Sequence, residues 1–210
     1  MAHLSRNLLI PALLLLHGTS LSQELPDLET MKTLPINLDA AASEFDRKKN
    51  QLFFRNLTIK QGELKIVADE ATATRLDFEN ALWEFSGSVV IENLGTTARC
   101  DYAEILFNEH QIHSAVMRGQ PATFEQFRID EERQTEGHAN LMEYDAKTGI
   151  IRMTENAWVS DSANEVSGNR ISYDLNRQYI IADADDDGQV RMKIIPPENS
   201  LPKIEDKMKQ

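Results

Sequence analysis

The chain has 210 residues, of which 41% are hydrophobic and 27% are charged, which suits one domain with a sizeable core or two small domains. Asp and Glu outnumber Lys and Arg by 34 to 22, and the resulting net charge of −12 argues against a nucleic-acid-binding protein. The single cysteine, Cys100, excludes an internal disulfide framework and a multi-cysteine zinc site. Because no histidine or basic cluster lies near it in the sequence, we expect a buried, inert thiol.

Residues 1–22 are predicted to form a secretory signal peptide. Arg6 is followed by the aliphatic run Leu8–Leu16, and Ser20-Leu21-Ser22 provides a cleavage signal of small residues. The run is too short to cross a bilayer comfortably. We therefore expect an exported protein that begins at Gln23, with an uncleaved N-terminal anchor as the alternative. Residues 23–33 are expected to be flexible.

From residue 34 onward the hydrophobic pattern predicts β-strands. Trp83, Phe85, Val89 and Ile91 alternate with polar residues, and residues 57–68 read as two strands joined by a turn at Gln61-Gly62. Residues 39–46 fit either a helical turn or a strand that leads to a turn at Lys48-Lys49-Asn50. Short alternating segments separated by turn signals predict an all-β fold of antiparallel strands, with one face buried and one face exposed to solvent.

A weak internal repeat of about 32 residues is typical of stacked β units. Segments 56–73, 87–105 and 155–173 can be superimposed, and a fourth copy falls at 135–144. Asp69, Asp101 and Asn169 occupy the equivalent place in the first three. Repeated strand-turn-strand units that share one interior predict an elongated molecule. After Ile195 the alternation stops, and residues 197–210 are expected to form a mobile tail.

The sequence offers little catalytic or metal-binding chemistry. His110 and His113 are three residues apart, which places them on opposite faces of a strand, so we expect surface histidines. The run Asp183–Gly188 matches the opening of a calcium loop, but the twelfth position is Ile194 instead of a glutamate, and the flanks read as strands. An EF-hand is therefore rejected, and a weak calcium contact at this turn stays open. We predict no cofactor, no metal site and no enzymatic activity.

Seven short motifs recur in a characteristic order along the chain: Leu34–Leu38, Gln61–Asp69, Gly119–Gln126, Glu136–Ala139, Met142–Tyr144, Thr154–Ala157 and Gly168–Tyr173. Together they resemble the motifs of the OstA-like periplasmic lipopolysaccharide-transport family. The resemblance extends over residues 34–196, which we take as one domain. One departure is an additional strand-turn-strand unit within residues 56–107.

The resemblance implies a twisted, open β-jellyroll with a hydrophobic interior that stacks end to end and carries lipopolysaccharide across the periplasm. The implied partners are lipopolysaccharide, an inner-membrane-anchored protein of the same fold, an outer-membrane translocon and further copies of the chain, without nucleic acid. One alternative is a packed structural or adhesive β-repeat scaffold that lacks a lipid conduit. A β-helical polysaccharide-modifying enzyme is disfavoured because no catalytic constellation is evident.

Charge considerations limit how such a protein would hold its ligand. Lipopolysaccharide is polyanionic and the chain is acidic, so burial of acyl chains, at about 0.8 kcal/mol per methylene, must provide the affinity. Core packing is the alternative role for each apolar residue, and Asn37 is expected to face away from the groove. The residues predicted to line an acyl-chain groove are Ile36, Leu38, Ile59, Ile66, Phe124, Tyr144, Ile171 and Tyr173.

An open jellyroll leaves unpaired strand edges at its two ends. The sequence places the first edge at Leu34–Ala40 and the last at Gln189–Ile195, with Arg191 and Lys193 facing water. Pairing of the last edge of one copy with the first edge of the next would give filaments of variable length. The alternating residues predicted to form these edges are Leu34, Ile36, Leu38, Val190, Met192 and Ile194.

Overall fold

The computed structural model describes residues 33–128, 133–161, 163–184 and 188–196. The predicted signal peptide, nearly all of the segment 23–33 and the tail 197–210 lie outside the described residues. The centre of the Asp183–Gly188 run lies outside them as well. The domain boundaries at 34 and 196 therefore stay a prediction, although the sheet itself extends from Asn37 to Ile194.

The all-β prediction is confirmed. None of the described residues belongs to a helix, so this part of the chain contains no helix that could span a membrane. The strands are β1 (Asn37–Asp39), β2 (Ala42–Asp46), β3 (Gln51–Gln61), β4 (Leu64–Ala73), β5 (Asn80–Asn93), β6 (Thr96–Asn108), β7 (Gln111–Arg128), β8 (Arg133–Asp145), β9 (Ile150–Ser160), β10 (Asn164–Asp174), β11 (Tyr179–Asp183) and β12 (Arg191–Ile194).

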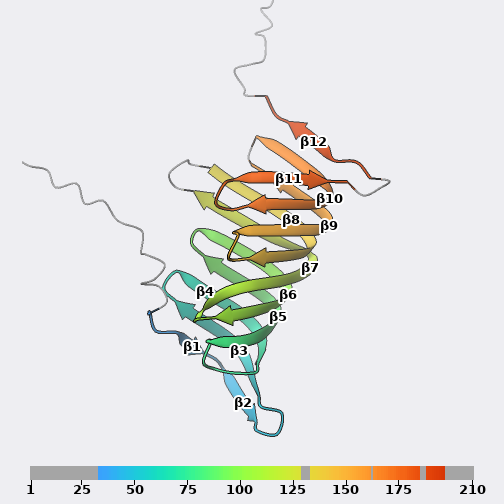
Figure 1. The fold of residues 1–210 in the computed structure, drawn as a ribbon. Coiled ribbons are helices and arrows are strands. Elements are labelled where there is room, and N and C mark those ends of the chain that lie inside the picture. The colour runs from blue at the N-terminus through green and yellow to red at the C-terminus, as the bar shows by residue number, and fades with distance from the viewer. Residues whose placement is uncertain (1–32, 129–132, 162, 185–187, 197–210) are drawn as a thin grey trace, which may run out of the picture.

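The strands form a single antiparallel sheet in which consecutive strands from β3 to β11 are neighbours in space. The order is β1-β3-β4-β5-β6-β7-β8-β9-β10-β11, while β2 also pairs with β3 and β12 also pairs with β10. The result is the elongated molecule that the repeat predicts (Figure 1). One turn differs from its predicted position: Gln61 pairs with Leu64, so the β3–β4 turn is Gly62-Glu63, where Gly62 has a φ of 55°.

The long strands bend at a shared corner, where their ladders are interrupted. Gly87 has a φ of 70°, and a Cβ placed on it would lie 2.5 Å from Asp69 Oδ2, so both the backbone and the neighbouring side chain require glycine. Bulges of this kind bend a sheet. Asp69, Asp101 and Asn169 of the repeat all fall on this corner. The corner residues are Asn56, Asp69, Gly87, Ser88, Asp101, Gly119–Pro121, Asn140, Glu155, Asn156 and Asn169.

Bending at the corner folds the sheet into two layers that face each other. The corner closes one side, and hairpin turns border the opposite, open side (Figure 1). The first layer consists of β1, 57–61, 64–68, 89–93, 96–100, 122–128, 133–139, 157–160, 164–168 and β12. The second layer consists of β2, 51–55, 70–73, 80–86, 102–108, 111–118, 141–145, 150–154, 170–174 and β11.

Each end of the sheet is an edge made of two short strands, one in each layer. β1 and β2 both pair with β3, and β11 and β12 both pair with β10. The predicted edges were therefore incomplete, because β2 and β11 were not assigned to them. They were also too long: Leu34, Ile36 and Val190 precede the strands. Pro35 explains the late start of β1, because it lacks an N–H group and restricts the residue before it.

The core lies between the two layers. Ile59 and Ile66 of the first layer are 1% and 0% exposed, and the outward-facing residues beside them carry the charges. Lys65–Glu92 at 3.2 Å and Arg99–Glu125 at 2.9 Å are exposed pairs between neighbouring strands, each worth about 0–1 kcal/mol. Burial of apolar side chains between the layers is therefore the main stabilising contribution.

Candidate functional site

A cavity of about 180 Å³ lies between the two layers at the open side of the molecule. Its rim comes from the turn that follows β5 and the turn that follows β10, which belong to different layers. The residues that line it are Ile91, Asn93, Leu94, Thr96, Ala98, Ile112, Ala115, Met117, Phe124, Gln126, Tyr144, Ile151, Leu175 and Asn176. It is thus an apolar space with a neutral polar rim.

Small side chains on facing strands leave this space open. Ala98 of β6 and Ala115 of β7 both project inward, and each ends at its Cβ atom. Met117 and Ile112 complete the floor, and methionine adapts readily to ligands of irregular shape. The cavity is therefore encoded by side-chain volume at inward positions and does not require a break in the sheet.

A hydrogen bond joins the two layers beside the cavity. The Tyr173 hydroxyl of the second layer donates to Gln126 Oε1 of the first layer at 2.8 Å, and it lies 3.4 Å from Thr135 Oγ1. The Tyr173 ring also stacks on Phe124, with 5.6 Å between ring centroids. Gln126 reaches back to the Leu175 carbonyl oxygen at 3.5 Å. This interlayer bridge of Tyr173, Gln126 and Thr135 closes the space between the layers on that side of the cavity.

Two further hollows continue along the open side. One, of about 180 Å³, shares Leu94, Ile112 and Tyr144 with the cavity and extends to Leu64. The other, of about 490 Å³, lies at the first edge and is lined by Leu34, Pro35, Ile36, Leu38, Leu76 and Phe78 among others. Hollows lined mainly by apolar residues therefore occur from the first edge to the middle of the molecule, and the one at the first edge also contains Asp77 and His110.

All eight predicted groove residues face the interior, and the exposed Asn37 faces outward as predicted. Phe124 and Tyr144 line the cavity, and Ile36 and Leu38 line the hollow at the first edge. The remaining residues, Ile59, Ile66, Ile171 and Tyr173, are buried in the core and line none of the three hollows. The structure therefore brings the eight residues to one face but does not gather them into one site.

Several lining residues had no distinguishing signal in the sequence. Ala98, Ala115 and Ile151 are ordinary inward residues whose importance depends on what lies opposite them in the other layer. Leu175 follows β10 in a turn and has a partly buried side chain that packs against the core. A turn leucine between Asp174 and Asn176 was the one available clue.

The site is electrically neutral. None of the residues that line the cavity is Asp, Glu, Lys, Arg or His. Burial, together with the nearby Asp145 carboxylate, raises the pKa of Tyr144, so its hydroxyl stays protonated at neutral pH. Among the described residues no group of three or more His, Cys, Asp or Glu side chains could hold a metal ion. The arrangement can therefore accommodate an uncharged apolar chain.

Cys100 and His113 line none of the three hollows, whereas His110 lines the hollow at the first edge together with Asp77. Cys100 is buried near the corner, where burial raises the pKa of its thiol to about 12, which confirms the expectation of a buried thiol. His110 lies in a turn and His113 on β7, and both are exposed, as predicted.

Comparison with known proteins assigns the family. The model of the LptA/(LptD N-terminal domain) LPS transport protein family matches residues 37–179. The chain belongs to this family. The match confirms the resemblance found in the sequence motifs, and it covers every strand from β1 to β10. The position of an additional strand-turn-strand unit within residues 56–107 stays a prediction.

Curated relatives and a solved structure of this family are similar to the chain. The lipopolysaccharide export system protein LptA of Escherichia coli strain K12 is 26% identical over 163 residues, which cover 77% of this chain and 71% of the relative. LptA of Haemophilus influenzae is 24% identical, with 77% of each chain covered. The periplasmic LptH of Pseudomonas aeruginosa, a solved structure, has a TM-score of 0.43 and 18% identity, covering 79% of this chain and 99% of LptH.

Proposed function

We propose that this protein carries lipopolysaccharide through the periplasm and shelters its acyl chains between the two layers of the sheet. The observation that carries the proposal is the neutral, apolar cavity that lies between the layers at the open side. Acyl chains would enter between the hairpin turns, while the charged sugars would stay in water. Each methylene that leaves water contributes about 0.8 kcal/mol, so a few buried methylenes outweigh the repulsion expected from two acidic partners.

Loading requires the layers to separate. The cavity of about 180 Å³ is smaller than a typical ligand pocket of about 300–1,000 Å³. Separation at the open side would break the Tyr173–Gln126 hydrogen bond while leaving the corner intact, because the corner is continuous backbone. In this proposal the interlayer bridge holds the layers together until lipid enters, and the corner is the hinge about which they separate.

The proposal includes assembly of copies end to end. Phe45 of β2 is 52% exposed, and Met192 and Ile194 of β12 are 67% and 70% exposed, so apolar side chains are uncovered at both edges. Pairing of β11 and β12 of one copy with β1 and β2 of the next would cover them and extend the groove. An inner-membrane-anchored protein of the same fold would load one end, and an outer-membrane translocon would receive lipid at the other. Residues 1–22 would direct export to the periplasm.

Photo-crosslinking tests the groove. A photoreactive amino acid at Ile112 or Tyr144, which line the cavity, should capture lipopolysaccharide, as should one at Ile36 or Leu38. The matched controls are His113 and Glu143, which are exposed neighbours on the same strands and point outward. Equal labelling at Glu143 and Tyr144 would refute the groove. A packed structural scaffold, the alternative function, would capture no lipopolysaccharide at any of these positions and would not bind a fluorescent fatty-acyl probe.

Deletion of residues 189–210 tests the assembly. The deletion removes β12 and leaves β11 on β10, so one layer of the last edge is lost and the core is retained. We expect a folded protein that no longer forms a concentration-dependent series of oligomers in sedimentation velocity. The double substitution Met192→Asp with Ile194→Asp should have the same effect with the strand still present. An unchanged series in both variants would place the contact elsewhere.

A further inference from the structure

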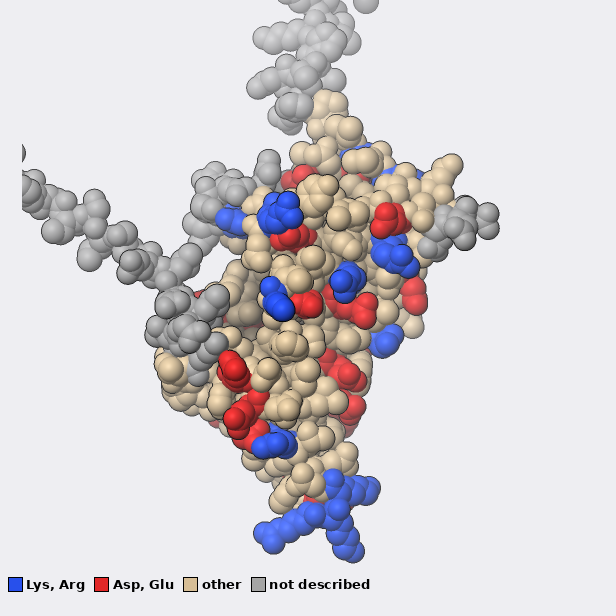
Figure 2. Space-filling view, viewed as in Figure 1, with Lys and Arg blue, Asp and Glu red and all other residues tan. Residues whose placement is uncertain are grey.

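A basic tip projects from the end of the molecule that carries the first edge. The tip is the turn between β2 and β3, formed by Arg47, Lys48 and Lys49, all of which are exposed. Figure 2 shows the Lys and Arg side chains gathered at this narrow end, while both signs of charge are mixed over the rest of the visible face. In a chain with a net charge of −12, residues 42–55 hold four basic and two acidic side chains. The tip therefore has the opposite sign to the protein as a whole.

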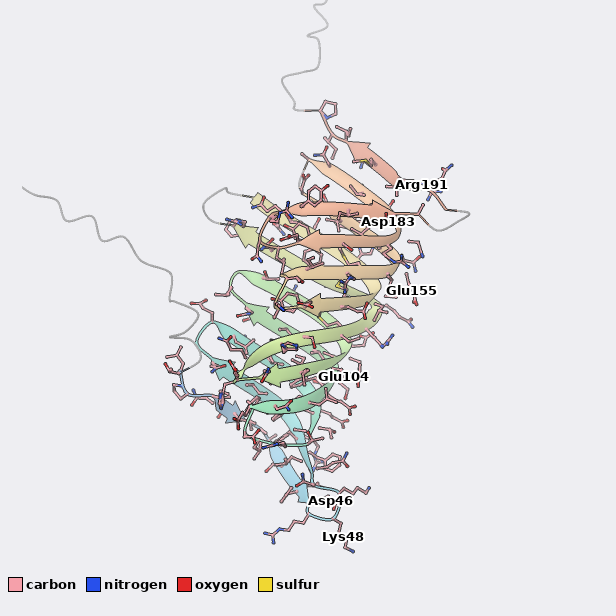
Figure 3. The ribbon with its side chains drawn as sticks, in the orientation of Figure 1. Asp46, Lys48, Glu104, Glu155, Asp183 and Arg191 are labelled. Atoms are coloured by element: carbon pink, nitrogen blue, oxygen red, sulfur yellow. The ribbon has the colours of Figure 1, made fainter. Side chains whose placement is uncertain are left out.

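Local hydrogen bonds stabilise the turn, and its one acidic residue, Asp46, accepts hydrogen bonds from the backbone. Asp46 Oδ1 accepts the backbone N–H groups of Lys48 at 2.9 Å and Lys49 at 3.2 Å. Asn50, with a φ of 52°, completes the turn and donates its side-chain amide to the Thr74 carbonyl oxygen at 3.3 Å. Figure 3 shows Asp46 and Lys48 at the extreme end of the molecule. The turn thus holds its backbone in place while its basic side chains point into solvent.

The basic side chains are not neutralised by neighbouring acids. Within the described residues, Arg47, Lys48 and Lys49 form no ion pair, and the nearby Glu44 is paired with Arg55 at 3.6 Å. Three positive charges are therefore available to an external anion. Their positions within three consecutive residues of a turn concentrate that charge at one point of the surface.

Two aromatic rings stand directly behind the charges. Phe45 and Phe53 are 52% and 38% exposed, and the pairing of Phe45 with Leu52 and of Phe53 with Glu44 places them on opposite faces of the hairpin. Basic residues beside exposed aromatic rings are typical of segments that bind the interface of an anionic membrane, where the charges contact phosphates and the rings enter the acyl boundary.

We propose that the β2–β3 tip binds the anionic headgroup surface of a phospholipid membrane. The narrowness of the tip favours a membrane over a protein partner. A stable protein interface buries about 800 Å² on each side, and a four-residue turn does not offer that area. A fluid layer of phosphates requires no such surface, because headgroups rearrange around a protruding charge. The proposal goes beyond lipopolysaccharide carriage, because it gives a copy whose first edge is not covered by another copy, and whose Phe45 is therefore still exposed, a direct contact with a bilayer.

Vesicle co-sedimentation of the full chain tests the proposal without lipopolysaccharide, so its failure leaves the proposed carrier function untouched. We expect binding to vesicles of phosphatidylcholine with phosphatidylglycerol and little binding to pure phosphatidylcholine. Each basic residue at such a surface strengthens binding about five-fold, so the triple variant Arg47→Gln, Lys48→Gln, Lys49→Gln should bind about 100-fold more weakly. Binding should also vanish in about 1 M salt, where the Debye length is about 3 Å.

A matched control separates the tip from general electrostatics. The triple variant Arg118→Gln, Arg152→Gln, Arg170→Gln removes the same charge from three exposed arginines of the second layer. It should bind the anionic vesicles as the wild type does. Equal loss in both triple variants, or unchanged binding of the tip variant, would overturn the proposal. Binding that is insensitive to salt and to phosphatidylglycerol would identify the apolar run Leu8–Leu16 as the contact and would also overturn it.

Discussion

Two regions of the same interior differ in how they are filled. Near the first edge, five aromatic rings pack together, four from the second layer and Phe78 from the connection between β4 and β5: Phe54, Phe78, Trp83, Phe85 and Phe107. Phe78 stacks on Trp83 with 4.8 Å between ring centroids, and Phe85 stacks on the same indole at 5.9 Å. In the middle of the molecule, Ala98 of the first layer and Ala115 of the second layer both line the cavity, and their side chains are too small to fill it.

Side-chain volume, and not the path of the backbone, therefore determines where this fold is hollow. Both regions are built from the same pair of layers, bent at the same corner, and β6 contributes to both. The aromatic region even retains a buried Trp83 Nε1 with no hydrogen-bond partner, which costs about 1–3 kcal/mol and shows that packing dominates there. We infer that the aromatic region provides stability, while the cavity region provides the space that a ligand needs.

Trp83→Ala should have the largest effect. Trp83 is fully buried and contacts three aromatic rings, so its removal should lower the free energy of unfolding by about 3–5 kcal/mol. Urea denaturation measures the change. Phe127→Ala is the control, because that ring is 54% exposed and its loss should matter little. A small effect at Trp83 would mean that the aromatic region does not provide the stability assigned to it.

The same substitution should act differently in the two regions. Ala103→Leu places three heavy atoms beside Phe85, at a fully buried position that lines none of the three hollows, and should lower the free energy of unfolding by about 1–3 kcal/mol. Ala115→Leu places the same atoms in the cavity, so stability should stay within about 1 kcal/mol of the wild type. Binding of a fluorescent fatty-acyl probe should weaken about ten-fold in Ala115→Leu, the loss of burying one or two methylenes. Equal destabilisation by the two variants would erase the distinction between the regions.

The pH dependence of stability at Cys100 tests whether water reaches the interior beside the corner. Its folded pKa is about 12, against 9.0 as the usual value, so the folded protein keeps the thiol proton where the unfolded chain loses it. The stabilisation is fully present below pH 9.0 and is lost as the pH rises towards 12. Between about pH 9 and about pH 10 the free energy of unfolding should fall by about 1 kcal/mol more in the wild type than in Cys100→Ala. Parallel pH profiles would indicate that water reaches the thiol.

Tyr173→Phe should have the smallest effect on stability and a visible effect on opening. The variant keeps the ring on Phe124 and removes the hydrogen bond to Gln126, which is worth about 0.5–1.5 kcal/mol. Stopped-flow binding of the acyl probe should become faster, because one restraint between the layers is gone. Tyr179→Phe, which alters a tyrosine that is 56% exposed on β11, should leave the rate unchanged. An unchanged rate in Tyr173→Phe would mean that the layers open elsewhere.

Alternation in the sequence predicted the faces of the strands well, because side chains of a strand alternate whatever its neighbours are. It placed Ile36, Leu38 and Phe124 inward and Asn37 outward. It also placed Asp69, Asp101 and Asn169 at equivalent points, although their shared role at a corner emerges only when the ladders are paired. A bulge is a mismatch between two strands, so one strand read alone does not reveal it.

Sequence patterns did not predict the cavity, and they did not predict that β2 and β11 belong to the edges. The reasons are related. Tyr173 and Gln126 are 47 residues apart, and their contact depends on how two layers meet. Ala115 resembles any buried alanine until the residues opposite are known. β2 has a mostly exposed pattern with Glu44 and Asp46 at alternate positions, so its composition suggested a turn as readily as a strand.

From β3 to β10 each strand pairs with its sequence neighbour, so the length of the molecule grows by whole hairpins. Adjacent strands are about 4.8 Å apart, so one two-strand unit adds about 10 Å along the axis. β3 and β10 carry the two edges, and hairpins could be added or removed between them without altering either joining surface. The reach of one copy can therefore change in steps of one hairpin while its ends stay compatible with those of other copies. Gene duplication of such a unit would lengthen a bridge without a new interface.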